Sequence, residues 1–472
     1  MQRCIMDELD GIDCGDKRLN GRSRKVLETL SVNTRASVNS SFETWSETQA
    51  AYRLFDNPRV TPEAVLQPHA EASLRRIAET PAALIVQDTT ELDYSKHPPK
   101  DARCLTKPDR LGLYLHTQLA VTPEGVPLGV VGSETFARDA ETLGQTKKRD
   151  KLPIEDKESV RWLNGYRKSC EIAARLPQTR IVSIGDREAD IYDIFLQAQE
   201  GQASAAGTAA DYVVRSKENR RLNQRVPPRE HGSRNVKYRK LYDTVRLAPV
   251  RYRKTISLPA THKRAKRMAT LEIRAETVTF KHPKNRSGLP EVRCNIVYVQ
   301  EVNPPATAIE EDSVVEWWLI TSLPIDSNDR IEQVIEYYRK RWTVEVYFRT
   351  LKTGCRVEAI GLETVARLTT CLAFYQIIAW SVLYLTHMNR ESPELPCDVV
   401  FLDCQWQSVW RVVTQKELPP EPPTLAEFMK LLAALGGYNN RPNEPPPGPQ
   451  SIWIGVRRMH DFATAWQAFG PG

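Results

Sequence analysis

Polar and apolar residues alternate over the first 80 residues in the pattern of amphipathic helices. One predicted helix begins near Asp16 and runs to Leu30, and a second, SETQAAYRLFDNPRV, ends at the turn signal Asn57–Pro58. A third predicted helix, PEAVLQPHAEASLRRIAET, follows directly. The pattern therefore predicts a helical domain over residues 1–80.

The first of these helices is rich in cations, since it carries Arg18, Arg22, Arg24 and Lys25. Two interpretations are open for such a segment. It either packs as one member of a plain helical bundle or presents its cations to the phosphates of DNA. Composition alone does not separate the two.

Short apolar runs predict a sheet in the next part of the chain. Strands are expected at residues 83–86, 113–121, 127–135, 180–185 and 211–215, with a helix at 155–176. The order strand, hairpin, helix, strand, helix, strand indicates an α/β fold with a mixed sheet. Asp88 follows the first strand and Asp186 follows the fourth. Because sites gather at strand ends, we expect these two carboxylates to lie side by side. The alternative for Asp186 is a helix N-cap.

The segment from Asp326 to Gly354 has helical periodicity without internal Gly or Pro, so we expect one long helix. Asp329 is the expected N-cap, with Glu332 in the capping-box position, and Gly354 is the expected left-handed end.

Four chemically active side chains share one face of that helix. At roughly 100° per residue they fall within a stripe about 60° wide, and they are Tyr338, Arg341, Glu345 and Lys352. A carboxylate beside cations and a phenol suits a site that holds a metal ion and phosphates together. The alternative is a solvated helix face with intrahelical ion pairs.

Alternating segments between about residues 221 and 325 predict a β-rich insertion, and its basic runs favour contact with a DNA backbone. Residues 368–388 are apolar for long enough to cross a bilayer, but we interpret them as a buried core helix. Beyond them, residues 391–472 are rich in Pro and contain the amphipathic helix TLAEFMKLLAALGGY.

Composition narrows the functional classes. The chain of 472 residues has a formal net charge of +7, which suits a polyanionic partner. Its 9 Cys form no CxxC pair, so we do not expect a structural zinc site. The odd number of Cys predicts a cytoplasmic chain with reduced thiols. The N-terminal residues lack the apolar core of a signal peptide, and no membrane partner is expected.

The spacing Tyr338-x2-Arg341-x3-Glu345-x6-Lys352 is similar to the YREK signature of the insertion-sequence-four type, or Tn-five-like, bacterial DDE transposases. The resemblance covers nearly the whole chain and is strongest at 85–94, 183–192 and 338–354. Further segments that resemble this family are GDKRLNGR, ETQAAYRLFDNPRV, EDKESVRWL, RWTVEVYFRTLKTG and IWIGVRRMHDFATAW.

The resemblance implies a ribonuclease-H-like catalytic core at 81–390 with the β-rich insertion, between an end-binding helical domain at 1–80 and a dimerisation region at 391–472. It implies cut-and-paste transposition, in which two Mg²⁺ or Mn²⁺ ions held by Asp88, Asp186 and Glu345 support phosphodiester hydrolysis, hairpin formation and strand transfer. The C-terminal helix is short for the family, which puts the dimer interface in doubt.

DNA contacts are expected at Tyr338, Arg341, Lys352, Trp317, Arg215, Arg18 and Arg22. The resemblance aligns Trp317 with the family's tryptophan that takes the place of a flipped base, and a register slip of one residue would move that role to Trp318. The partners expected are double-stranded DNA, as transposon ends and target, and a second copy of the chain in a bacterial nucleoid. Two alternatives stay open, which are a nuclease of the same fold without strand transfer and an inactive end-binding protein.

Overall fold

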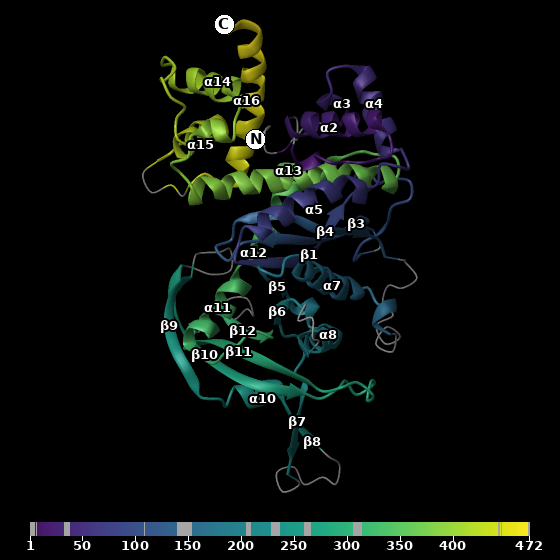
Figure 1. Ribbon diagram of the computed structural model, residues 1–472, viewed down its shortest axis with the longest axis vertical. Coiled ribbons are helices and arrows are strands. Elements are labelled where there is room, and N and C mark those ends of the chain that lie inside the picture. The colour runs from purple at the N-terminus through teal and green to yellow at the C-terminus, as the bar shows by residue number, and fades with distance from the viewer. Residues whose placement is uncertain are drawn as a thin grey trace. The chain divides into compact units, whose positions relative to one another are not determined.

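The protein is described from a computed structural model (Figure 1). The residues that it describes are 5, 7–32, 38–107, 109–138, 153–203, 209–227, 237–258, 266–304, 314–441, 444 and 446–470.

The chain forms two compact units that each draw on distant parts of the sequence. Unit 1 comprises residues 1–79, 89–144 and 342–472, and unit 2 comprises 80–88 and 145–341. The segment predicted as the catalytic domain, 81–390, therefore contributes to both units. The predicted domain boundaries stay a prediction, and the two units are described separately.

Unit 2 is built on one continuous sheet. Its strands in spatial order are the first part of β1 (Ala82–Asp93), then β5 (Arg180–Gly185), β6 (Asp211–Arg215), β12 (Glu316–Thr321), β11 (Val292–Val302), β10 (Arg267–Phe280), β7 (Arg221–Val226) and β8 (Lys237–Lys240), with β9 (Val250–Leu258) also paired to β10. The first three strands are parallel and the rest antiparallel. The β-rich insertion thus extends the core sheet through the pairing of β12 with β6.

Helices pack against this sheet. They are η3 (Ile154–Asp156), α7 (Val160–Arg175), η4 (Arg187–Ala189), α8 (Tyr192–Ala203), α10 (Leu241–Val245) and α11 (Asn328–Arg339). α7 contacts β5, α8 contacts β11, and α11 contacts β5, β6 and β11. Because the parallel strands carry continuous apolar runs, their central residues are fully buried, as expected of strands covered on both faces.

Unit 1 combines a small antiparallel sheet with most of the helices. Its elements are η1 (Asp7–Leu9), α2 (Lys17–Val32), α3 (Val38–Ser41), α4 (Trp45–Phe55), α5 (Pro62–Ala78), the second part of β1, β2 (Arg103–Cys104), β3 (Leu111–Val121), β4 (Pro127–Phe136), α12 (Trp342–Arg349), η6 (Thr350–Gly354), η7 (Val357–Ala359), α13 (Val365–Glu391), η8 (Cys397–Val399), α14 (Asp403–Thr414), α15 (Leu425–Leu435) and α16 (Pro449–Phe469).

α13 is the central helix of unit 1 and contacts α2, α4, α5, α16 and β4 (Figure 1). By length and composition it is apolar enough to cross a membrane, but 89% of its most apolar window is buried inside the structure. This burial agrees with the interpretation of residues 368–388 as a core helix.

A buried ionic cluster joins the N-terminal segment to this core. Glu8 accepts from His69 Nδ1 at 2.5 Å and from Arg76 Nη1 at 2.8 Å, while His69 Nε2 accepts the backbone N–H of Val130. Complete burial lowers the pKa of His69, so the ring is held neutral with its proton directed at Glu8. Arg76 also stacks over Trp380 of α13. The N-terminal helices are therefore tied to the rest of unit 1.

The prediction of one helix from Asp326 to Gly354 is wrong. The chain forms α11, a turn at residues 340–341, α12 and the π-helical turn η6. Ser327, rather than Asp329, caps the start by accepting from the Arg330 N–H, and the left-handed residue at the end is Arg356 rather than Gly354. The break falls between Arg341 and Trp342, where the chain passes from unit 2 to unit 1.

Candidate active site

The first two predicted carboxylates lie at matched positions on neighbouring parallel strands. Ala82 to Val86 of β1 pair with Arg180 to Ile184 of β5 in constant register, and continuing this register by two residues places Asp88 opposite Asp186. Adjacent strands are about 4.8 Å apart. Both side chains are partly exposed at the carboxyl ends of buried runs. This register supports the expectation that Asp88 and Asp186 lie side by side within unit 2, which stays a prediction.

Asp186 also performs the capping role that the sequence left open. Its Oδ1 accepts the backbone N–H of Glu188 at 2.8 Å, at the start of η4. This contact fixes the carboxylate at the strand end and occupies Oδ1 only. A cap and a ligand are thus compatible roles for the same side chain.

Arg341 lies against the first carboxylate. Its Nη1 is 3.0 Å from Asp88 Oδ2, and both side chains are less than one-fifth exposed. A guanidinium at this position neutralises Asp88 and is the side chain best shaped to bind phosphate oxygens. The structure thus places a predicted DNA contact directly at the strand edge.

Tyr338 is buried near the same edge. Burial raises the pKa of its phenol, the positive charges of Arg341 and Arg215 lower that pKa, and the negative charge of Asp186 raises it. Arg215 is held at the end of β6 by donating to the backbone oxygen of Glu316 at 3.2 Å.

The two adjacent tryptophans of β12 have different environments. Trp318 is 6% exposed and stacks on Tyr298 at 3.7 Å between ring centroids, with Tyr242 at 4.4 Å. Trp317 is partly exposed and meets Tyr338 edge-on at 5.5 Å. Trp318 is therefore a packed core residue, whereas Trp317 lies beside the predicted site with part of its surface accessible.

Glu345 and Lys352 belong to unit 1, on α12 and η6, whereas Asp88, Asp186 and Arg341 belong to unit 2. Glu345 and the two aspartates thus come from different units, and their assembly into one set stays a prediction. Among the residues that it describes, no group of three or more His, Cys, Asp or Glu side chains is assembled to hold a metal ion.

The donor chemistry of the strand edge nevertheless fits a divalent ion. Asp88 and Asp186 offer hard carboxylate oxygens, which Mg²⁺ and Mn²⁺ prefer and which do not favour zinc. The contact of Arg341 with Asp88 shows that a cation is accommodated there. A third carboxylate from another part of the chain would complete such a ligand set.

Sequence reasoning missed the role of Asp190. Its Oδ2 accepts the backbone N–H groups of Lys217 and Glu218 at 2.7 and 2.8 Å, and its Oδ1 accepts from Arg220. This buried carboxylate fixes the loop that follows Arg215. The sequence holds one sign of this role. In the run Asp186-Arg-Glu-Ala-Asp190 the second Asp has no obvious capping role, which suggests another partner for its carboxylate.

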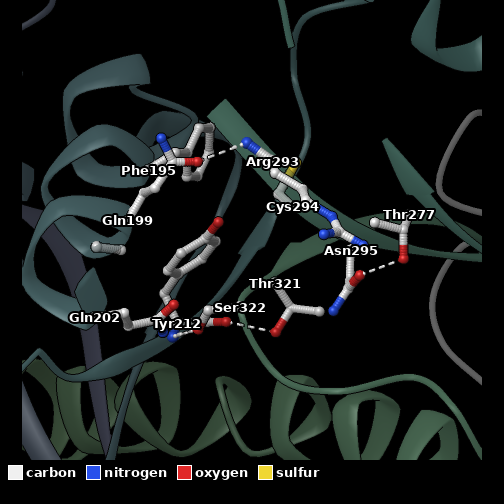
Figure 2. Close-up of a pocket in the computed structure, with 11 residues that line it drawn as sticks. Phe195, Gln199, Gln202, Tyr212, Thr277, Arg293, Cys294, Asn295, Thr321 and Ser322 are labelled. Carbon is white, nitrogen blue, oxygen red and sulfur yellow. Dashed lines mark hydrogen bonds between the residues drawn. The ribbon is translucent and has the colours of Figure 1, made fainter. Parts of the chain in front are cut away.

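One cavity of about 320 Å³ lies elsewhere in unit 2, between α8 and strands β6, β11 and β12 (Figure 2). Several of its polar groups are hydrogen-bonded, as in the bonds from Thr277 to Asn295 and from the Tyr212 N–H to Ser322. It adjoins the start of β6, whereas Asp186 follows the end of the parallel strand β5. The cavity is therefore not part of the carboxylate site.

The predicted cationic face of α2 is exposed in unit 1. Arg18 and Arg22 are exposed together with Lys25, while Ser23 and Leu27 on the opposite side of the helix are buried. Positions 18, 22 and 25 follow helical spacing, so the three cations share one face. Such a face can bind phosphates without disturbing the core of the unit.

We expect neutralisation of this face to weaken the salt dependence of DNA binding. Each phosphate contact that is lost should reduce the slope of log K against log salt by about 0.9. Replacing Arg18, Arg22 and Lys25 with Gln and measuring binding to end-bearing DNA across a salt series tests this. Replacing Arg330 and Arg339, exposed cations of α11 that pair with Asp326 and Glu336, is the control. An unchanged slope would return α2 to a packing role.

Comparisons with known proteins find similarity to transposases. Residues 1–60 match the family model described as transposase DNA-binding, residues 202–380 match the transposase DDE domain, and residues 377–467 match the transposase Tn5 dimerisation domain. Among solved structures, the chain is similar to a piggyBac transposase synaptic complex with hairpin DNA. That similarity has 12% sequence identity and a TM-score of 0.33, and it covers 93% of this chain and 71% of the other.

The three family models follow one another along the chain as a DNA-binding region, a catalytic domain and a dimerisation region. The α/β architecture with one large mixed sheet fits the ribonuclease-H-like core of such enzymes. The chain therefore belongs to the Tn5-like DDE transposases and is a DNA transposase.

Proposed function

We propose that this transposase moves its element by a cut-and-paste reaction in which Asp88, Asp186 and Glu345 act as one metal-binding set. DDE transposases use divalent metal ions. The finer proposal is two Mg²⁺ or Mn²⁺ ions, which when bound would activate the attacking oxygen and stabilise the leaving one. The observation that carries the proposal is the parallel register of β1 and β5, which brings Asp88 opposite Asp186 when it is continued by two residues.

Side chains around these three carboxylates would position the phosphates of the DNA. Arg341 holds the Asp88 carboxylate, and an incoming phosphate would compete for the same guanidinium. Tyr338, whose ring meets Trp317 edge-on, and Arg215 would contact neighbouring phosphates. Phosphoryl transfer depends mainly on positioning and on neutralising charge, which is what this group of residues provides.

The proposed reaction proceeds by successive in-line displacements. Water attacks a phosphodiester at the element's end, the P–O3′ bond breaks, and a 3′-hydroxyl is released. That hydroxyl attacks a phosphodiester of the opposite strand, whose P–O3′ bond breaks, so that a hairpin forms and the flanking DNA leaves with a 3′-hydroxyl. A second water breaks the P–O3′ bond of the hairpin, and the regenerated 3′-hydroxyl attacks a target phosphodiester and displaces a target 3′-oxygen. Hairpin formation needs a base to leave the stack, and stacking by Trp317 would offset part of that cost.

The proposed partners are the transposon ends, target DNA and a second copy of this chain. A DNA-binding and a dimerisation family model match the two ends of the sequence. We propose a homodimer that brings two ends together in the bacterial nucleoid.

The test is incubation of the purified protein with end-bearing DNA, target plasmid and Mg²⁺, with Ca²⁺ or chelator as controls. We expect cleaved ends, hairpins and joined products that depend on Mg²⁺. Nicking without joining would favour a nuclease of the same fold instead. Specific binding to the ends without cleavage would favour an inactive end-binding protein.

A further inference from the structure

The chain that follows Lys352 has an unusual local conformation. Lys352 lies in the π-helical turn η6, which ends with the Cys355 N–H donating to the Thr350 oxygen at 2.9 Å. Arg356 then adopts a left-handed conformation with φ 49°, which is disfavoured for a residue with a Cβ. π-Turns and left-handed residues of this kind concentrate at functional sites. This turn reverses the chain and directs η7 back toward Lys352.

Glu358 on η7 makes two contacts after this reversal. Its Oε1 accepts the backbone N–H of Asp93 at 2.9 Å and lies 3.6 Å from Lys352 Nζ. All three residues belong to unit 1. The carboxylate therefore links the lysine to the backbone of β1, five residues beyond Asp88 on the same strand.

We propose that Glu358 is a positioning residue that holds Lys352 in the orientation needed to bind a DNA phosphate during cleavage. The proposal rests on the function proposed above, in which Lys352 contacts phosphate. A lysine side chain has four rotatable carbon–carbon bonds and is a poor directional donor when it is unrestrained. Anchoring its ammonium through Glu358 to a strand backbone restricts where that charge can lie.

If Glu358 acted only through its charge, removing it would favour DNA binding rather than slow cleavage. A carboxylate beside a DNA-contacting lysine repels phosphate, so its removal should strengthen DNA binding if it has no positioning role. Isolated ion pairs between partly exposed side chains also add little to stability. Lys352 and Glu358 are 29% and 34% exposed, so variants at both positions should fold.

The experiment compares Glu358→Gln, Lys352→Gln and the double variant in single-turnover cleavage at saturating end-bearing DNA. Glu358→Gln keeps an oxygen for the Asp93 N–H but removes the charge. Misplacement of a reacting group can cost up to about a hundredfold, and we expect cleavage to fall about tenfold or more in each single variant. The double variant should be no slower than Lys352→Gln alone, because Glu358 acts through the lysine.

Glu363→Gln is the matched control, since Glu363 pairs with Lys100 and Arg367 in the same unit and does not contact Lys352 among the described contacts. Its cleavage rate should be unchanged, and melting temperatures of all variants should agree. Faster cleavage or unchanged cleavage in Glu358→Gln would overturn the positioning role. If Lys352→Gln itself cleaves normally, the phosphate contact in the proposed function fails, and this inference fails with it. A slow Lys352→Gln with a normal Glu358→Gln overturns this inference alone.

Discussion

Replacing Asp88, Asp186 or Glu345 with Ala is expected to abolish strand cleavage while binding to end-bearing DNA stays nearly intact. Each carboxylate is proposed to bind metal, and metal ions contribute several kcal/mol of transition-state stabilisation. A loss of that size corresponds to about a thousandfold or more in rate. The measurement is single-turnover cleavage with saturating Mg²⁺, alongside a binding titration for each variant.

Asp193→Ala provides the control for this series. Asp193 lies in the same unit as Asp88 and Asp186 and forms a paired contact with Arg286 at 2.6 and 2.8 Å. Loss of this pair should lower thermal stability without a selective loss of cleavage. If any one of the three carboxylate variants cleaves at the wild-type rate, that residue does not belong to the metal-binding set.

Replacing Trp317 with Ala is expected to block the reaction after the first nick. If its ring replaces a flipped base, the variant loses stacking worth about 1–3 kcal/mol per base. Nicked DNA should therefore accumulate while hairpins and double-strand breaks decline. Because Trp317 is partly exposed, we expect the melting temperature of the Trp317→Ala variant to differ little from that of the wild type. Nicks and hairpins are quantified in parallel on denaturing gels, with thermal unfolding of the same samples.

Trp318→Ala is the comparison. Trp318 is buried against Tyr298 and Tyr242, so its truncation should cost about 3–5 kcal/mol of stability and reduce binding, nicking and hairpin formation together. A selective hairpin defect in Trp318→Ala alone would move the stacking role to that residue. Equal losses of nicking and hairpins in Trp317→Ala, with a large fall in stability, would make Trp317 a core residue.

The neighbouring positions of Asp88 and Asp186 could be predicted because they follow from strand order. Two apolar runs that each end in Asp, separated by a helix, place both residues at the same edge of a parallel sheet. The structure adds the register, which follows from side-chain packing that a single sequence does not display. Of the two roles that the sequence allows for Asp186, the structure shows the cap, and the metal-binding role stays a prediction.

The break at residues 340–341 could not be predicted from local signals. No Gly or Pro marks it, and the helical pattern of polar and apolar residues continues through it. α11 packs on strands of unit 2, whereas α12 packs on α13 and β3 of unit 1. Because most helix stability in proteins comes from packing, the helix ends where the chain changes packing partners. The stripe shared by Tyr338, Arg341, Glu345 and Lys352 is therefore not a single helix face.

Two other features depend on contacts between residues that are distant in sequence. The insertion joins the core sheet through β12 and β6, which are separated by about one hundred residues in the chain. Glu358 reaches Asp93 and Lys352 only because Arg356 turns the chain back. Neither a strand pairing nor a left-handed Arg leaves a periodic pattern in the sequence, so both required the structure.

The most direct test of the central proposal is the position of bound Mn²⁺ in a crystal of the protein with end-bearing DNA, located by its anomalous scattering. We predict one or two Mn²⁺ ions in contact with Asp88 and Asp186, with Glu345 as the third carboxylate ligand and any two ions about 4 Å apart. Mn²⁺ bound elsewhere, or Glu345 far from ions held by the two aspartates, would contradict the assignment of these three residues as one catalytic set.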